Sequence, residues 1–330
     1  MIMNYGMESF TGIRPTADLT VANYIGAIKP ILDQEAEGNE TAVFLAELHA
    51  TTTHRPSEVA EYAKDLGRTL IASGVEGEIY SQRQVSDLVL ETELSLRGLT
   101  TVSRLLRLPT LKEKVTHSDK TENATVALAM YPLLMASDIV LARPREVPTG
   151  KDQKPHLEIT NELIRAFNRE YGANLPIPQV REVVLPNIMS LDGTGRKMSK
   201  SYPKGAIFLN ETPEEGRKKI SKAVTASEPG EAMDASIDNM IDIGSGLVIP
   251  DSSEIEELQK IGVDIKNGER RMKEFKDGLG EIVVGFLTDM NARRDEISDD
   301  AVTQRIQQGS QWFRSIGQET VDHMRSAYWG

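Results

Sequence analysis

The chain of 330 residues contains no cysteine, and this absence excludes disulfide bonds, a thiol nucleophile and a zinc site built on cysteine. No run of residues approaches the ~18 apolar side chains that a membrane-spanning helix requires. Residues 1–6 have neither the basic flank nor the apolar stretch of a signal peptide. We therefore expect a cytoplasmic protein that does not interact with a membrane.

The chain also lacks an excess of positive charge, since its formal net charge is -12. Proteins that bind nucleic acid normally present basic surface, so the total charge argues against such a partner. The distribution argues the other way, because basic residues gather in 104–114, 196–204 and 217–222, whereas acidic residues gather elsewhere, as in 254–257. An acidic chain with local basic patches can still bind RNA.

The first part of the chain has the pattern of an α/β protein. Hydrophobic residues (39%) and charged residues (27%) are in the proportions of a globular protein of one large or two ordinary domains. Apolar runs alternate with amphipathic helical patterns, which indicates a parallel sheet. The expected strands are 41–46, 78–80 and 181–185, and the expected helices are 58–73 and 156–171.

Helical periodicity replaces this alternation later in the chain. A helix start with proline in its first turn lies at 212–215. Residues 269–290 carry apolar side chains at steps of three and four, which indicates a helix with one buried stripe. Residues 302–328 are a further helix or a pair of helices. We predict two domains, an α/β domain at 1–207 and a helical domain at 208–330.

The segment Lys197-Met198-Ser199-Lys200-Ser201 places two ammonium groups and two hydroxyls on five consecutive residues. It follows the segment 191–196, whose two glycines make the approach flexible. A mobile loop of this composition suits a clamp on a polyphosphate, because lysines act as point charges on phosphate oxygens. A lone Lys-x-Ser-Lys would indicate a solvated basic turn, whereas the full pentapeptide favours phosphate binding.

Residues 10–27 have the pattern of a strand, a tight turn and a helix that opens near Leu19 or Thr20. In α/β folds, the N-terminus of the helix after a first strand holds phosphates. The small residues Ala17 and Ala22 allow another group to approach the backbone closely. Thr20 and Asn23 are three residues apart, so both can face one ligand. An ordinary first strand–helix unit is the alternative interpretation.

Two further polar residues stand in informative positions. Asp138 is the one acid in the apolar helical run 131–141. A carboxylate there is costly unless it is paired or meets a ligand, the alternative being a helix residue that faces solvent or caps a neighbour. His49 follows a predicted strand, and with His54 it has no nearby carboxylate or third histidine, so we expect no metal site. A satisfied core or loop histidine is the alternative for His49.

Over most of residues 8–228, these segments resemble the tryptophanyl-tRNA synthetases, a family of class I aminoacyl-tRNA synthetases, in order and spacing. The segment 197–201 resembles the second class I signature. Residues 10–27 resemble the first signature in its tryptophanyl version, in which Thr20 and Asn23 replace two histidines.

The chain departs from the family pattern at four positions. The family has glycine where this chain has Ala17 and Ala22, and it usually has glutamine where this chain has Arg14. The methyl group of Ala22 would lie where the family binds adenine. Lys151 stands where the family usually has glutamate, which reverses the charge.

The middle of the chain resembles the part of the family that recognises the amino acid. Residues 131–141 resemble its specificity helix, in which the acid accepts the indole N–H and the methionine packs beside the ring. Residues 148–156 resemble its Gly-Glu-Asp-Gln-Lys-Gln-His element. Tyrosine-specific relatives carry glutamine three residues before the acid, where this chain has Met135, so tryptophan is favoured over tyrosine. An apolar pocket without an acceptor would also admit phenylalanine.

The resemblance implies a set of site residues. The residues implied to bind ATP are Arg14, Pro15, Thr16, Thr20, Ala22, Asn23, Gly150, Lys151, Asp152, Ile188, Lys197, Met198, Ser199, Lys200 and Ser201. The residues implied to bind tryptophan are Phe10, His49, Tyr131, Met135, Asp138 and Gln153. The residues implied to be catalytic, by contacting the ATP phosphates, are Lys197, Lys200 and Lys112.

The resemblance also implies an architecture and an activity. The fold would be a Rossmann-like catalytic domain with a helical insertion at about residues 82–125, followed by a helical anticodon-binding domain. The enzyme would activate L-tryptophan with ATP and Mg²⁺, release pyrophosphate, and transfer the acyl group to tRNA(Trp). Family members are homodimers, so a two-fold dimer is expected.

Three alternatives remain at this stage. A tyrosine-specific synthetase would share the scaffold. A non-catalytic paralogue would explain the four departures from the family pattern. An unrelated nucleotide-binding transferase would share the sheet, since fold alone does not fix function, although the lysine pentapeptide argues against it.

Overall fold

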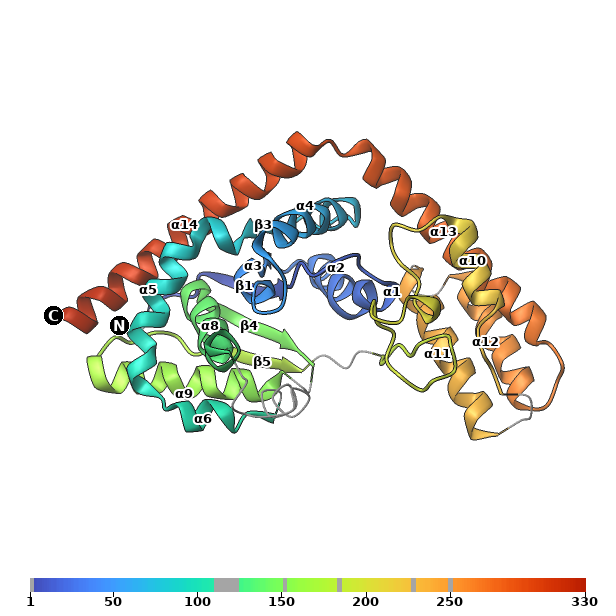
Figure 1. Cartoon of the computed structure of the whole chain (residues 1–330), viewed down its shortest axis with the longest axis horizontal. Coiled ribbons are helices and arrows are strands. Elements are labelled where there is room, and N and C mark those ends of the chain that lie inside the picture. The colour runs from blue at the N-terminus through green and yellow to red at the C-terminus, as the bar shows by residue number, and fades with distance from the viewer. Residues whose placement is uncertain (1–2, 110–124, 151–152, 183–185, 227–229, 249–251) are drawn as a thin grey trace.

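The computed structural model describes residues 3–109, 125–150, 153–182, 186–226, 230–248 and 252–330. Its described strands form one parallel sheet in the order β3-β2-β1-β4-β5 (Figure 1). The strands are β1 (Met7–Ile13), β2 (Thr41–Leu45), β3 (Glu78–Ser81), β4 (Pro144–Thr149) and β5 (Gln179–Glu182). The order reverses between β1 and β4, and such a switch point opens a crevice at the carboxyl ends of the strands. The predicted Rossmann-like α/β fold is confirmed.

The strands form where apolar runs can be buried on both faces. All five residues of β2 are buried, as expected for an inner strand of a parallel sheet. The predicted strands at 41–46 and 78–80 are confirmed as β2 and β3. The prediction of 181–185 overlaps β5, and its last three residues lie outside the described part of the chain.

Helices cover both faces of the sheet. In this part of the chain they are α1 (Val21–Asn23), the π-helical turn η1 (Tyr24–Ile28), α2 (Lys29–Ala36), α3 (Glu47–Ala50), α4 (Pro56–Ala72), η2 (Gln82–Val85), α5 (Ser86–Leu96), η3 (Arg97–Leu99), α6 (Val102–Leu106), α8 (Val126–Ala142) and α9 (Lys154–Tyr171). Pro56 starts α4, and the Glu58 carboxylate accepts the Arg55 N–H at 3.0 Å. Gly74 and Gly172 follow α4 and α9 at φ values of +91° and +70°, which confirms both predicted helix ends.

A second group of helices lies beside the α/β part and has its own hydrophobic cluster (Figure 1). After the turn η5 (Pro203–Gly205), the helices are α10 (Pro213–Ser221), α11 (Glu231–Leu247), α12 (Ser253–Lys266), α13 (Met272–Glu296) and α14 (Asp299–Trp329). The predicted helices at 269–290 and 302–328 are confirmed, the second as one continuous helix. No described helix is long and apolar enough to cross a membrane.

The last helix, α14, returns from these helices to the edge of the sheet (Figure 1). There it covers β3, whose outer backbone groups have no neighbouring strand. Arg305 donates to the carbonyl oxygens of Glu76 and Gly77, and the Ser81 N–H donates to the Ser310 Oγ at 3.0 Å. These bonds close an otherwise open strand edge. The predicted domain boundary at 207/208 stays a prediction, and the packing of α14 ties the end of the chain to the sheet.

Candidate active site

A cavity of about 940 Å³ opens at the carboxyl ends of β1, β2 and β4, next to the switch point of the sheet. Parallel α/β folds bind ligands at this edge. The predicted residues that line the cavity are Phe10, Arg14, His49, Tyr131, Met135, Asp138, Gly150 and Gln153. Residues from four separate segments, all predicted to bind tryptophan or ATP, therefore share one cavity.

Asp138 is the buried acid of this cavity, with 1% of its surface exposed. The His49 Nε2 lies 2.8 Å from its Oδ2, and the Gln82 Nε2 lies 2.8 Å from both carboxylate oxygens. Burial raises the pKa of Asp138, while the hydrogen bonds from His49 and Gln82 oppose that rise. The cost of burying this acid is offset by two partners, and the group remains on the cavity wall as an acceptor.

The wall beside Asp138 is apolar and aromatic. The rings of Phe10 and Phe44 stack with centroids 4.9 Å apart, and Met135 packs against the same hydrophobic cluster. Gly12 allows this arrangement, because a Cβ there would lie 2.3 Å from the Phe44 ring. An apolar slot with one buried acceptor suits a flat ring that carries a single polar N–H.

Arg14 brings a cation to the other end of the cavity. Its Nη2 donates to the Thr53 Oγ1 at 2.8 Å, and its buried Nε has no hydrogen-bond partner among the described residues. Burial lowers the pKa of this guanidinium. A half-buried cation with an unsatisfied donor suits an anionic ligand group.

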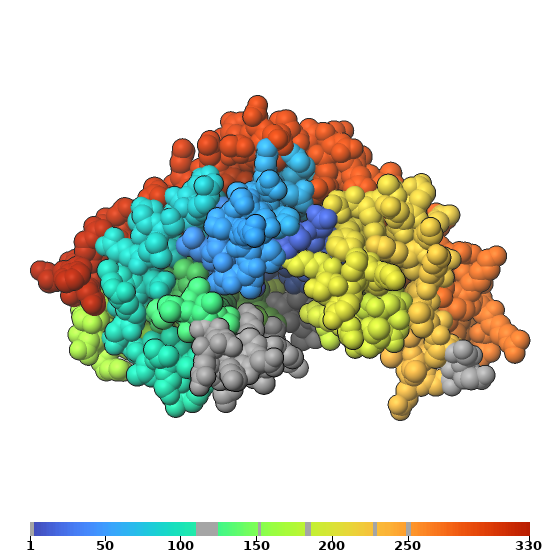
Figure 2. All heavy atoms as spheres, in the orientation of Figure 1, coloured from blue at the N-terminus to red at the C-terminus, as the bar shows by residue number. Residues whose placement is uncertain are grey.

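The lysine loop lies against the turn after β1. Backbone bonds from Met198 N to Ile188 O (2.8 Å) and from Ser190 N to Arg196 O (2.7 Å) close the loop at its base. Met198 is buried in the hydrophobic cluster of the helical part, whereas Lys197 is exposed. In Figure 2 the yellow-green to yellow part of the chain, which includes this segment, lies between the blue α/β part and the orange helices.

Lys200 connects the loop to the turn after β1, since its Nζ donates to the Thr16 Oγ1 at 2.5 Å. Burial lowers the pKa of Lys200, and the nearby positive charge of Arg14 lowers it further. The positive charges of Lys200 and Arg14 therefore repel each other near the turn after β1. An anion bound between them would relieve that repulsion.

Thr20 and Asn23 hydrogen-bond mainly with each other. Thr20 caps α1, and the Asn23 Oδ1 accepts from the Thr20 N–H and Oγ1, both at 3.0 Å. Thr20 and Ala22 are buried, and Ala22 packs in the hydrophobic cluster of Met198 rather than on the cavity wall. The predicted residues that do not line the cavity are Pro15, Thr16, Thr20, Ala22, Asn23, Ile188, Lys197, Met198, Ser199, Lys200 and Ser201.

Ala17 has a backbone φ of +107°, in the region that favours glycine. It is one of the two positions at which alanine replaces a glycine of the resembled pattern, and its positive φ gives this replacement a steric cost. Three predicted site residues, Lys112, Lys151 and Asp152, lie outside the described part of the chain.

Sequence analysis missed Gln82 as a site residue. Gln82 is fully buried and follows the last residue of β3, just as Arg14 and Gly150 follow β1 and β4. Residues directly after parallel strands meet at one edge of the sheet, where ligands bind. The place of Gln82 directly after a strand could therefore have indicated a site residue. The described residues include no group of three or more acids or histidines that could hold a metal ion.

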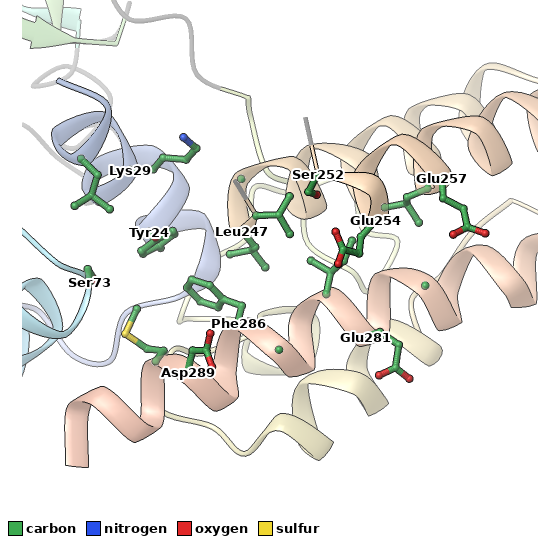
Figure 3. A pocket seen from close by; sticks show the side chains of 18 of the residues that line it. Tyr24, Lys29, Ser73, Leu247, Ser252, Glu254, Glu257, Glu281, Phe286 and Asp289 are labelled. Atoms are coloured by element: carbon green, nitrogen blue, oxygen red, sulfur yellow. The ribbon is translucent and has the colours of Figure 1, made fainter. Parts of the chain in front are cut away.

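A second cavity, of about 1050 Å³, lies between α2 and the helices α11 to α13 (Figure 3). None of the predicted site residues lines it. Its rim is largely acidic, with Glu254, Glu257, Asp277 and Asp289, which repels polyphosphate. The cavity at the carboxyl edge of the sheet is therefore the better candidate for an active site.

Comparison with known proteins agrees with this geometry. The family model "tRNA synthetases class I (W and Y)" matches residues 4–288. A tryptophan–tRNA ligase of Mycoplasmopsis pulmonis is 35% identical over 300 residues, 87% of each chain.

Two solved structures share the fold over nearly the whole chain. The tryptophanyl-tRNA synthetase of Mycoplasma pneumoniae superposes with a TM-score of 0.81 at 26% identity and covers 98% of this chain and 97% of its own. That of Campylobacter jejuni, complexed with ADP and tryptophan, superposes with a TM-score of 0.79 at 27% identity and covers 97% of this chain and 99% of its own.

Proposed function

Because the chain belongs to the family of class I tRNA synthetases for tryptophan and tyrosine, we propose that it is a tryptophan–tRNA ligase. The observation that carries the choice of amino acid is the buried carboxylate of Asp138 in an otherwise apolar, aromatic-lined cavity. An indole ring needs one acceptor for its N–H and apolar surface for the rest. Phenylalanine offers no donor, so the buried acceptor would lose its bonds to water without replacement.

The tyrosine-specific alternative shares the scaffold but fits the cavity less well. Met135, on the helix that carries Asp138, supplies an apolar contact where tyrosine-specific relatives have glutamine. The relative from Mycoplasmopsis pulmonis and both solved structures are named for tryptophan. Tryptophan is therefore the substrate that this chain activates.

In the first half-reaction, the tryptophan carboxylate attacks the α-phosphorus of ATP, and the bond to the bridging oxygen breaks. Pyrophosphate leaves with that electron pair, and tryptophanyl-adenylate forms. We assign Arg14 and Lys200, whose charges repel each other near the turn after β1, to hold the charge of a phosphate, with Lys197 and Lys112 at the pyrophosphate. Catalysis consists of positioning and charge stabilisation, without a protein nucleophile.

In the second half-reaction, a terminal ribose hydroxyl of tRNA(Trp) attacks the acyl carbonyl and AMP leaves. We assign Thr20 and Asn23 to the nucleotide end of the site, with Gly150, Lys151 and Asp152 near the ribose. Gln153 would hold the ammonium or carboxylate of the amino acid. Mg²⁺ is assigned to the ATP phosphates as part of the substrate, because phosphate oxygens and water satisfy its preference for oxygen ligands.

We further propose a cytoplasmic two-fold dimer that uses the helical insertion as its interface. Leu90 and Leu94 lie one turn apart on α5 and are 54% and 39% exposed. Two exposed leucines on one helix face favour burial against a second copy. The helices α10 to α13 are assigned to the anticodon end of the tRNA, with Lys218, Lys219 and Lys222 as the basic face.

The test of this function is pyrophosphate exchange with ATP and Mg²⁺ in the presence of tryptophan, tyrosine or phenylalanine. Exchange with tryptophan alone is the expected result. Exchange with tyrosine would overturn the specificity assignment and retain the scaffold. No exchange with any amino acid would make the non-catalytic paralogue the better interpretation.

A further inference from the structure

Gln82 makes direct contact with the proposed specificity residue. Its Nε2 lies 2.8 Å from both oxygens of Asp138, and its Oε1 accepts the backbone N–H of Leu48 at 2.9 Å. The Leu48 N–H can only donate, so the amide oxygen must face it and the NH₂ group must face the carboxylate. Gln82 is fully buried, and both ends of its side chain are therefore fixed.

The residues on either side of Gln82 are held as firmly as the side chain itself. The carboxylate of Glu47 accepts from the Ser81 hydroxyl and from the Arg83 N–H, the latter at 3.0 Å. The Ser81 N–H donates to Ser310 of α14. Glu47 and His49 belong to the same short helix, α3, so one element positions both donors to Asp138.

The two oxygens of Asp138 differ in what they accept. Oδ2 accepts from His49 and from Gln82, whereas Oδ1 accepts from Gln82 alone among the described residues. A carboxylate oxygen has two lone pairs, so Oδ1 retains one for a further donor. Asp138 lines the cavity, and a ligand donor is the partner that this lone pair can meet.

We propose that Gln82 is a specificity-determining positioning residue, which holds Asp138 as an ionised acceptor and leaves its Oδ1 to the ring N–H of the amino acid. The inference rests on the proposed function and deepens it. A carboxylate that accepts on both oxygens has no proton to give, so the substrate ring must supply the donor. Gln82 thus favours a ring that carries a donor, such as indole, over the phenyl ring of phenylalanine, which carries none.

The charges around Asp138 support this role. Burial raises the pKa of Asp138, and the hydrogen bonds from His49 on α3 and Gln82 on η2 oppose that rise. Burial and the charge of Asp138 raise the pKa of Glu93 on α5, whereas the charges of Arg97 and His49 oppose that rise. Burial and the charge of Asp138 also raise the pKa of Tyr80 on β3. If the Gln82 donor is removed, only His49 still opposes the effect of burial on Asp138. The pKa of Asp138 should therefore rise further.

The test uses Gln82→Met, which keeps the length of the side chain and removes its donor, with the exposed Gln84→Met as the matched control. In tryptophan-dependent pyrophosphate exchange, KM for tryptophan should rise about 10- to 100-fold, the loss of one hydrogen bond to a charged group. The kcat should fall less than KM rises. The preference for tryptophan over phenylalanine should fall by the same factor, and Gln84→Met should match the wild type.

A pH series and a double variant separate positioning from general damage. In Gln82→Met, the further rise in the pKa of Asp138 keeps the carboxyl group neutral up to a higher pH than in the wild type, so KM for tryptophan should fall as pH rises through that pKa. In the background Asp138→Asn, the added Gln82→Met change should cost less than about threefold, because the acceptor is already lost. A second variant, Gln82→Glu, keeps an acceptor for the Leu48 N–H and should also reduce the preference for tryptophan.

The outcomes distinguish this inference from the proposed function. A wild-type protein without tryptophan-dependent exchange would overturn the function. A wild-type protein with exchange, together with folded Gln82 variants of unchanged KM and unchanged preference, would overturn the role of Gln82 alone. If Gln82→Met raised KM for tryptophan by the same factor in the wild type and in the Asp138→Asn background, that result would also overturn the role of Gln82.

Discussion

At the scale of single residues, two half-buried cations, Lys200 and Arg14, lie at the turn after β1, and burial lowers the pKa of each. The charge of Arg14 lowers the pKa of Lys200 further, whereas the charge of Asp18 opposes that change. Repulsion between the two cations is unfavourable, and an incoming phosphate would relieve it.

Replacement of Lys200 by alanine should lower the rate of tryptophan activation by about 10²- to 10³-fold, the loss typical of one transition-state charge contact. KM for tryptophan should stay within about threefold, because Asp138 and the apolar wall are untouched. Steady-state pyrophosphate exchange measures both parameters. Lys204→Ala, an exposed lysine in the same basic stretch, is the control, and full turnover of the Lys200 variant would remove Lys200 from catalysis.

Replacement of Ala17 by glycine should stabilise the protein. The strain of a left-handed residue with a Cβ is about 1–2 kcal/mol, and the greater freedom of glycine in the unfolded chain offsets about 0.5–1 kcal/mol of that gain. The free energy of unfolding from urea titration should therefore rise by up to about 1 kcal/mol. The same change at the exposed helical residue Ala292 should have the opposite sign, and a destabilised Ala17→Gly protein would contradict the argument.

At the scale of elements, the packing of α14 against β3 is a feature that the sequence pattern did not predict. Gly309 lies where a Cβ would come within 2.1 Å of the Ile79 carbonyl oxygen, so helix and strand touch backbone to backbone. The Tyr80 and Phe313 rings stack beside this contact with centroids 3.9 Å apart. The floor of the cavity, through Phe44 and Phe10, thus rests on α14.

Gly309→Ala should destabilise the protein by about 1–3 kcal/mol, since the new methyl group meets backbone and α14 must shift. The midpoint of urea unfolding should fall accordingly. Gly285→Ala, in the middle of α13, places its methyl group in open space and should stabilise the protein by about 0.5–1 kcal/mol. Equal effects of the two changes would show that α14 does not depend on this close approach.

The order of apolar and polar residues predicted those strands and helices in which buried residues form a continuous run or recur at helical spacing. The strand β2, with all five residues buried, and α4, with Val59, Leu66 and Leu70 on one face, could be identified from the sequence. The helices α11 and α12 could not be placed, because their short apolar stripes are interrupted by glycines and acids. The second domain was nevertheless correctly predicted to be helical.

The candidate site likewise contains residues that could be predicted from the sequence and residues that could not. Motif residues such as Asp138 and Lys200 could be named, because their order along the chain resembles a known family. Gln82 could not, because its importance depends on a contact with Asp138, 56 positions away in sequence. The mutual capping of Thr20 and Asn23 also depends on hydrogen-bond geometry that spacing alone leaves open.

At the scale of the whole molecule, charge and apolar surface are distributed unevenly. The formal net charge is -12, yet the lysine loop is basic and α5 exposes Leu90 and Leu94. Net negative charge disfavours non-specific contact with RNA and with other acidic proteins. The basic lysine loop and the exposed leucines of α5 differ from this acidic surface, and they are therefore the places at which we expect a partner to bind.

The double change Leu90→Asp and Leu94→Asp should convert the proposed dimer to monomers, because buried carboxylates without partners oppose association. Sedimentation velocity at micromolar concentration should show the wild type at twice the mass of the variant. Val263→Asp, at a residue of α12 that is 57% exposed, should leave the mass unchanged. A wild type that sediments as a monomer would overturn the proposed dimer.

The buried Met198 has a consequence for how the two parts of the molecule communicate. Met198 shares one hydrophobic cluster with Ala22 of α1, with Ile25 of η1, and with Phe275 and Leu279 of α13. A displacement of the helical part is therefore transmitted to the segments that we assign to ATP. Coupling free energies are reciprocal. If tRNA bound to those helices changes the affinity for ATP by a given factor, then bound ATP must change the affinity for tRNA by the same factor.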